Sequence, residues 1–68
     1  MNEEALNLSI RKFLKMVGVN SQRKIEHAIA KAAAAGAIAG TETFAAKMRL
    51  EVAGLKVNVE YSGDIQLQ

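Results

Sequence analysis

Hydrophobic positions in the first part of the chain recur at the period of an α-helix. From Glu3 to Val17 they lie three or four residues apart and form one stripe, made of Leu6, Ile10, Phe13, Leu14 and Val17. Asn2 can cap this helix, and the acidic residues that follow it suit the positive end of the helix dipole. Gly18 favours the left-handed conformation that ends many helices. The pattern predicts a first helix over residues 3–17.

A second apolar stripe follows the segment Gly18-Val19-Asn20, which we interpret as a tight turn. Asn20 or Ser21 can cap a helix that runs to about Ala35, and Gly36 can end it. Its apolar side is formed by Ile25, Ala28, Ile29 and Ala32. The four consecutive alanines at 32–35 have the highest intrinsic helix propensity. The pattern predicts a second helix over residues 21–35.

After Gly36 and Gly40 the hydrophobic period changes to two, which is typical of half-buried strands. From Thr43 to Val52, apolar and polar residues alternate, and Ala53-Gly54 offers a turn. A second strand is expected through Val57, Val59 and Tyr61. We interpret Ser62-Gly63-Asp64 as another turn, followed by a short third strand at residues 65–67. The sequence predicts one α+β domain over residues 1–68, with two helices packed on a three-stranded antiparallel meander (ααβββ).

Charge is distributed unevenly along the chain, whose formal net charge is +2. Residues 1–36 carry six bases and three acids, whereas residues 37–68 carry three bases and four acids. A basic helical half has two interpretations: solvated helix faces, which are the more common case, or a surface for an acidic partner. No secretory signal and no membrane-length apolar segment is recognisable, so a cytoplasmic location with no membrane contact is expected.

Chemistry-bearing residues are scarce. The chain has one histidine, His27, and no cysteine, and no glycine-rich phosphate loop or nucleophile motif is present. The four acids of the strand region are expected on the outer sheet face or in turns, opposite bases, which indicates cross-strand ion pairs and not a catalytic carboxylate pair. We therefore expect no catalytic residue, no metal site and no cofactor, and interpret the protein as non-enzymatic.

Two interaction surfaces remain. The first is the polar face of the first helix, where Leu8 lies among Arg11, Lys12 and Lys15 and could anchor a protein partner. The second arises because Gly18, Val19 and Ile25 resemble a DNA-binding helix-turn-helix, although the glycine-to-aliphatic spacing is one residue too long. In that alternative, Arg23 and Lys24 would contact nucleic acid at the start of the second helix.

The chain also resembles a family of short uncharacterised bacterial proteins that share a GV-x-SQR-x-IE segment. The matching residues here are Gly18, Val19, Ser21, Gln22, Arg23, Ile25 and Glu26. The resemblance implies a small cytoplasmic bacterial protein and no particular activity.

The sequence thus favours a protein-interaction module over a nucleic-acid-binding one. The partner is an unknown protein or a second copy, with weak self-association expected through residues 64–68, which form an unguarded sheet edge.

Overall fold

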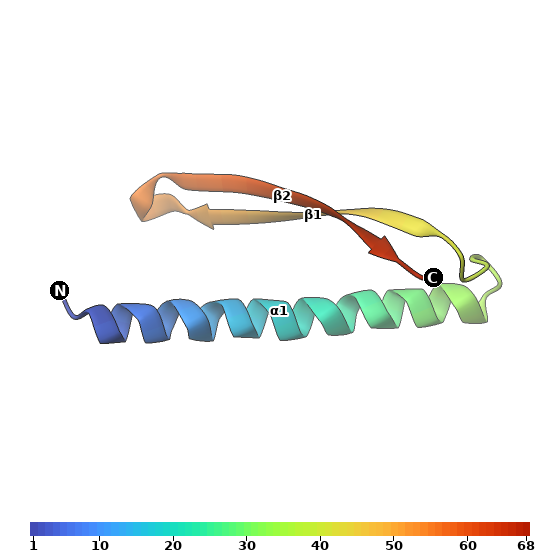
Figure 1. The fold of residues 1–68 in the computed structure, drawn as a ribbon, viewed down its shortest axis with the longest axis horizontal. Coiled ribbons are helices and arrows are strands. Elements are labelled where there is room, and N and C mark those ends of the chain that lie inside the picture. The colour runs from blue at the N-terminus through green and yellow to red at the C-terminus, as the bar shows by residue number, and fades with distance from the viewer. The chain divides into compact units, whose positions relative to one another are not determined.

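The computed structural model covers residues 1–68 and contains one long helix followed by a β-hairpin (Figure 1). Helix α1 spans Glu3–Ala34, strand β1 spans Thr43–Val52 and strand β2 spans Val57–Gln66. A 3₁₀ turn, η1, covers Ala53–Leu55 between the strands. The chain divides into two compact units, residues 1–37 and residues 38–68. The fold is therefore α+β in the order αββ, and the predicted ααβββ order is wrong.

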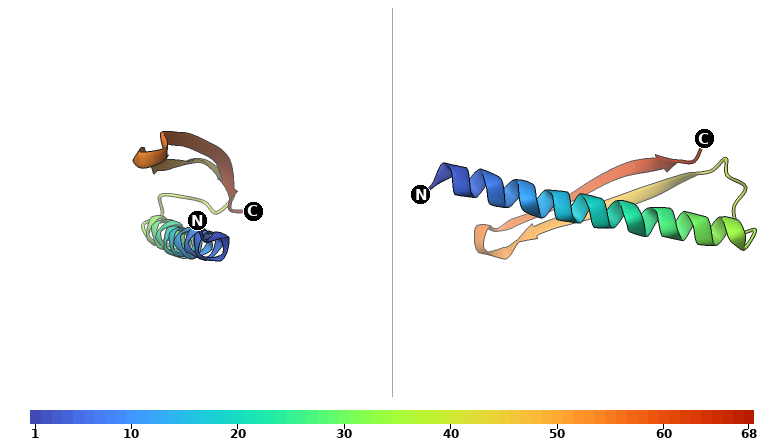
Figure 2. Two further views of the ribbon diagram at one scale, coloured as in Figure 1. Left: turned by 90° about the vertical axis from the view of Figure 1, so that its left-hand side faces the viewer. Right: turned by 90° about the horizontal axis from the view of Figure 1, so that it is seen from below.

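The predicted turn at Gly18-Val19-Asn20 does not exist, because α1 passes through these residues without a break (Figure 2). Gly18 has no positive φ, and no proline follows to prevent the helix from continuing. The Asn20 side chain donates from Nδ2 to the carbonyl oxygen of Met16 at 2.9 Å, within the helix. Glycine inside a helix costs about 1 kcal/mol relative to alanine, which a 32-residue helix can absorb.

Both ends of α1 carry the caps that the sequence predicts. The Asn2 side chain accepts a hydrogen bond from the backbone N–H of Ala5 at 3.1 Å, and Glu3 and Glu4 lie in the first turn. At the other end, Gly36 has φ +70°, and Ala37 donates its N–H to the carbonyl oxygen of Ala32 at 2.9 Å. This is the glycine-dependent Schellman arrangement, so Gly36 ends the helix where Gly18 does not.

The second unit is a two-stranded antiparallel ribbon, not a three-stranded meander. Strand β1 has the predicted bounds, and all ten of its residues pair with β2, from Thr43 opposite Gln66 to Val52 opposite Val57. The predicted turn at residues 62–64 lies inside β2, where Gly63 pairs with Ala46. The alternation from Val57 to Ile65 is never interrupted, so the glycine occupies an ordinary strand position and no third strand forms.

The connection between the strands is placed correctly but built differently. Residues 53–55 make the 3₁₀ turn, and Lys56 then takes the left-handed conformation with φ 55°. Gly54, the glycine of the predicted turn, has no positive φ. The lysine therefore bears the strained position that a glycine or asparagine would occupy at lower cost.

No residue of the chain is buried, so neither unit contains a conventional core of its own. Ile25, at the centre of the predicted second stripe, keeps 36% of its surface exposed, and Phe44 at the start of β1 keeps 39%. The apolar faces of the two units therefore count as surface when the interactions of this protein are considered.

Candidate functional site

The predicted interaction residues are brought together on one side of α1. Leu8, Arg11, Lys12 and Lys15 are spaced at i, i+3, i+4 and i+7, which are neighbouring positions on a helix surface. Leu8 is 68% exposed, more than any other large apolar side chain of the helix. None of the three bases takes part in an ion pair, because the ion pair in the structure lies in the hairpin. We call these four residues the Leu8 face.

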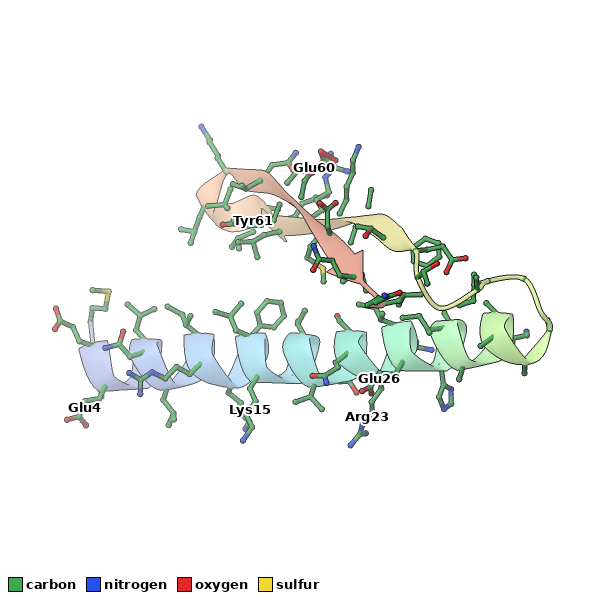
Figure 3. All side chains as sticks on the ribbon, turned by 45° about the vertical axis from the view of Figure 1, so that its right-hand side comes forward. Glu4, Lys15, Arg23, Glu26, Glu60 and Tyr61 are labelled. Atoms are coloured by element: carbon green, nitrogen blue, oxygen red, sulfur yellow. The ribbon has the colours of Figure 1, made fainter.

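The continuous helix extends this face to Arg23 but not to Lys24. At about 100° per residue, Arg23 lies about 60° round the helix from Leu8, whereas Lys24 lies about 160° away. Figure 3 shows Glu4, Lys15 and Arg23 projecting from the same side of the helix. The helix-turn-helix arrangement needs a turn that the structure lacks, so Arg23 and Lys24 are adjacent in sequence without belonging to a recognition helix.

The two apolar stripes of the sequence form one band along the other side of α1. Leu14 and Ile25 are eleven residues apart, which is about 20° of rotation, so the two stripes overlap on a single helix. Every large apolar side chain of the first stripe except Val17 is exposed, as the values for Leu6, Ile10, Phe13 and Leu14 show. Sequence reasoning assigned this band to a core, and the structure presents it as surface.

The hairpin has a second apolar surface that the sequence predicts only in part. The register places apolar residues opposite each other on one face, in the pairs Phe44–Ile65, Ala46–Gly63, Met48–Tyr61, Leu50–Val59 and Val52–Val57. The other face is formed by the remaining pairs, among them Lys47–Ser62 and Arg49–Glu60. The uninterrupted period of two through Gly63 is the signal that could have revealed the whole face.

Polar contacts on the polar face of the hairpin involve mainly Arg49. Its Nε lies 3.5 Å from Glu51 Oε1 on the same strand and donates to Asn58 Oδ1 at 3.1 Å. Both charged side chains are about 60% exposed, so the ion pair adds little stability. It does orient the guanidinium along the hairpin surface.

Glu42 organises the connector that precedes β1. Its carboxylate accepts backbone N–H groups from Ala39 at 2.7 Å, Gly40 at 2.8 Å and Thr41 at 3.1 Å. These hydrogen bonds, with that from Ala39 first among them, lower the pKa of Glu42 from its ordinary value of 4.5. Gly40 takes φ +94°, which allows its N–H to turn toward the carboxylate. The sequence predicted no such role for Glu42.

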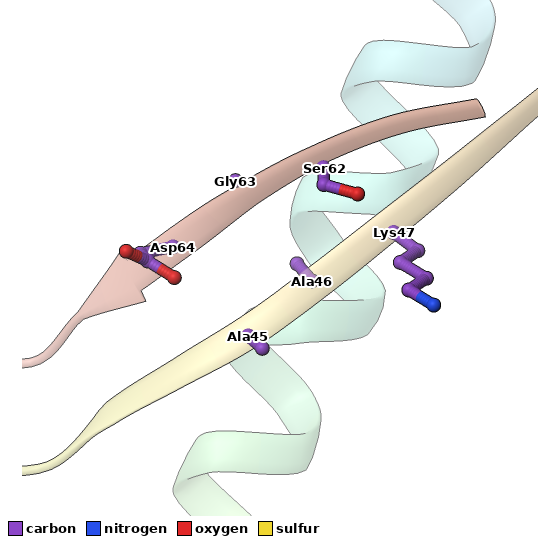
Figure 4. Close-up of a pocket in the computed structure, with 6 residues that line it drawn as sticks. All are labelled: Ala45, Ala46, Lys47, Ser62, Gly63 and Asp64. Carbon is purple, nitrogen blue, oxygen red and sulfur yellow. The ribbon is translucent and has the colours of Figure 1, made fainter.

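The hairpin also bears one shallow open hollow, shown in Figure 4. Small side chains leave this space because Ala46 faces Gly63 across the ladder, with Ala45 and Ser62 beside them. Lys47 and Asp64 complete the lining. No group of His, Cys, Asp or Glu residues is close enough to hold a metal ion, and α1 does not have the apolar length that a membrane span requires.

The fold and its surfaces define a small α+β protein of one helix and one hairpin, with exposed apolar faces. More particularly, the chain belongs to a family of unknown function, DUF6494, which its sequence matches over residues 1–68. No curated protein and no solved structure shows significant similarity to it.

Proposed function

We propose that the protein is a small non-enzymatic module that binds an acidic partner protein through the Leu8 face. The observation that carries the proposal is the position of Leu8, an exposed apolar side chain followed on the same side of the helix by Arg11, Lys12 and Lys15. An apolar anchor next to three unpaired bases suits a surface where an apolar pocket has acidic residues beside it. We also propose that the protein is bacterial and cytoplasmic, and that residues 18–26 form a segment shared by its family.

Two features support the Leu8 face as a binding surface. The bases have no acidic partner within the chain, so binding would not first have to break an internal ion pair. The helix that presents them has capped ends, and its backbone is held by internal hydrogen bonds, so the backbone of the face is ordered before binding. An ordered backbone loses less conformational entropy on association than a flexible loop would.

Photo-crosslinking from the face tests the proposal. A photoreactive phenylalanine analogue replaces Leu8, and a matched analogue replaces Ala30 on the same helix. We expect a discrete protein adduct from position 8 that is lost when Lys12 and Lys15 are changed to Glu. Equal adducts from both positions, or an adduct that survives the two charge reversals, would contradict the proposal.

Nucleic-acid binding is a second candidate, favoured by the continuation of the basic face to Arg23. Such binding releases counterions from phosphate and weakens steeply with salt, whereas an apolar protein contact does not. The test is a titration with generic duplex DNA and with RNA at low and near-physiological salt. A dissociation constant below about 10 μM at near-physiological salt, lost on Arg23→Glu and Lys24→Glu, would replace the protein-partner proposal.

A further inference from the structure

The free edge of β2 offers unpaired backbone groups, which the helix lacks, and it does not carry the bases that line the β1 edge. A two-stranded sheet has two free edges, and an isolated hairpin of this kind is marginally stable in water. Adding strands at one edge would stabilise it, provided that the facing side chains are compatible. The register of the hairpin determines which side chains would face each other.

The hydrogen-bond pattern identifies the residues whose backbone groups point outward. Leu67 donates its N–H to the carbonyl oxygen of Glu42 at 3.1 Å, so positions 42 and 67 form a hydrogen-bonded pair. Because such pairs alternate along an antiparallel ladder, the pairs of the apolar face are also hydrogen-bonded. The backbone groups of the polar-face residues therefore point to the free edges. On β2 these residues are all exposed: Asn58, Glu60, Ser62, Asp64 and Gln66.

We propose that the β2 edge binds the β2 edge of a second copy of this chain, antiparallel, with Tyr61 facing the partner's Tyr61 across the two-fold axis. If the two-fold axis passes through a residue of β2, the residues whose backbone groups point outward lie opposite each other in the two copies and can form hydrogen bonds. If the axis passes between two residues, each outward-pointing residue lies opposite an inward-pointing one. Two registers of the first kind overlap nine of the ten residues of β2, namely 57–65 and 58–66. Charge decides between them.

The register centred on Ser62 opposes Glu60 to the partner's Asp64, and does so twice by symmetry. The register centred on Tyr61 instead opposes Glu60 to the partner's Ser62 and Asn58 to the partner's Asp64, with no like-charged pair. Figure 3 shows Glu60 and Tyr61 on opposite faces of β2. On the apolar face, the Tyr61 register pairs Val57 with the partner's Ile65 and Val59 with the partner's Gly63.

The β1 edge cannot pair in the same way without opposing bases. Its two corresponding registers place Lys47 against either the partner's Lys47 or the partner's Arg49. Like charges directly opposite each other destabilise a sheet. Pairing β1 with the partner's β2 would leave an edge free at each end and would continue into an open polymer. The Tyr61 register closes as a dimer, whose four-stranded sheet has one continuous apolar face.

Substitution of Ser62 tests the register because it changes the stability of the dimer interface and the stability of the hairpin in opposite directions. In the Tyr61 register, Ser62→Lys faces the partner's Glu60, and Ser62→Glu brings two acids together. Within the hairpin, residue 62 faces Lys47. Ser62→Glu should therefore stabilise the hairpin of the monomer, and Ser62→Lys should destabilise it. Sedimentation equilibrium on the full chain should show the dimer dissociation constant lowered about 2- to 30-fold by lysine and raised by glutamate.

Single cysteines provide a second, independent test, because the chain contains no native cysteine. In the proposed register, Tyr61→Cys places the two cysteines in a non-hydrogen-bonded pair. Their Cα atoms would be about 4.5 Å apart, which suits a disulfide. Val59→Cys leaves the two cysteines offset by four residues, about 13 Å along the strand. Under mild oxidation we expect Tyr61→Cys to crosslink at least about tenfold faster than Val59→Cys or Ser62→Cys.

Four results would overturn the proposal. The first is a monomer at every concentration up to the millimolar range. The second is a dimer whose affinity does not respond to the two Ser62 substitutions, which would place the interface elsewhere, for example on α1. The third is a series of species larger than a dimer, which would indicate pairing of β1 with β2. The fourth is fastest crosslinking from Ser62→Cys, which would reject the Tyr61 register.

Discussion

The helix and the hairpin satisfy their backbone groups in different ways, and the difference decides how each can bind. In α1 the hydrogen bonds run within one segment, and capping contacts from Asn2 and Gly36 complete both ends. A partner can therefore meet the helix only through side chains. In the hairpin, each strand is paired on one side and leaves a row of N–H and C=O groups on the other. A partner can bind that backbone directly.

Glycine likewise has different consequences in the two units, and in the middle and after the end of one helix. Gly18 lies in regular helix, Gly36 lies in the left-handed region after it, and Gly63 lies within a strand. Gly18 therefore marks no boundary of the helix, Gly36 ends it, and Gly63 takes an ordinary place in the strand pairing. The backbone conformation, rather than the glycine itself, decides which of these applies.

The largest expected effect comes from breaking the helix in the middle. Gly18→Pro removes one helical hydrogen bond and inserts a ring against the preceding turn, at a cost of about 3 kcal/mol or more. The two remaining segments, near 3–17 and 20–34, are each of marginal length for an isolated helix. Circular dichroism should lose much of its helical signal at 222 nm. An unchanged spectrum would support the turn that the structure lacks.

A smaller effect with a sharper sign separates Gly18 from Gly36. Gly18→Ala should stabilise the helix by about 1 kcal/mol, because the added methyl group meets nothing within 4 Å and the conformation is helical. Gly36→Ala should destabilise it by about 1–2 kcal/mol, because φ +70° is unfavourable for alanine.

Thermal unfolding followed at 222 nm measures both changes, and each variant serves as the other's control. If the two substitutions shift the unfolding temperature in the same direction, the contrast between the two glycines is wrong.

Sequence reasoning predicted the features that depend on local chemistry. The cap at Asn2, the stop at Gly36 and the bounds of β1 are confirmed, because each depends on a few adjacent residues or on a strict period of two. The single helix and the two-stranded sheet were missed because Gly18 and the 62–64 segment were given the weight of turns. In both places the hydrophobic pattern continues across the supposed turn, which is the better evidence.

The candidate site divides along the same line. The spacing of the Leu8 face at i, i+3, i+4 and i+7 is a property of sequence, and the helix brings these residues together as expected. The backbone pattern of the β2 edge could not be predicted, because it depends on the register of the ladder. The role of Glu42 was equally hidden, since it depends on the conformation of the three residues before it.

The connection between the strands allows a milder comparison within the hairpin. Lys56 takes φ 55°, so Lys56→Gly should relieve strain and stabilise the hairpin by up to about 1 kcal/mol. Gly54 has no positive φ and no atom near its missing Cβ, so Gly54→Ala should be neutral or stabilise by about 0.4–1 kcal/mol. Thermal unfolding of the full chain, followed at the hairpin resonances by NMR, measures both. A destabilised Gly54→Ala would show that this residue, and not Lys56, bears the strain.

The smallest expected effect is the pH dependence of the connector between the two units. Hydrogen bonds from Ala39, Gly40 and Thr41 lower the pKa of Glu42 below 4.5. A lowered carboxyl pKa means that the ionised form favours the folded connector, so its contribution is complete above about pH 4.5 and is lost as the pH falls through the lowered value. The amide resonances of residues 39–41 should move together in one step below pH 4.5 in an NMR titration. Glu42→Gln should abolish that step, whereas Glu60→Gln, whose side chain accepts none of these bonds, should leave it in place. A step that persists in Glu42→Gln would mean that another group holds the connector.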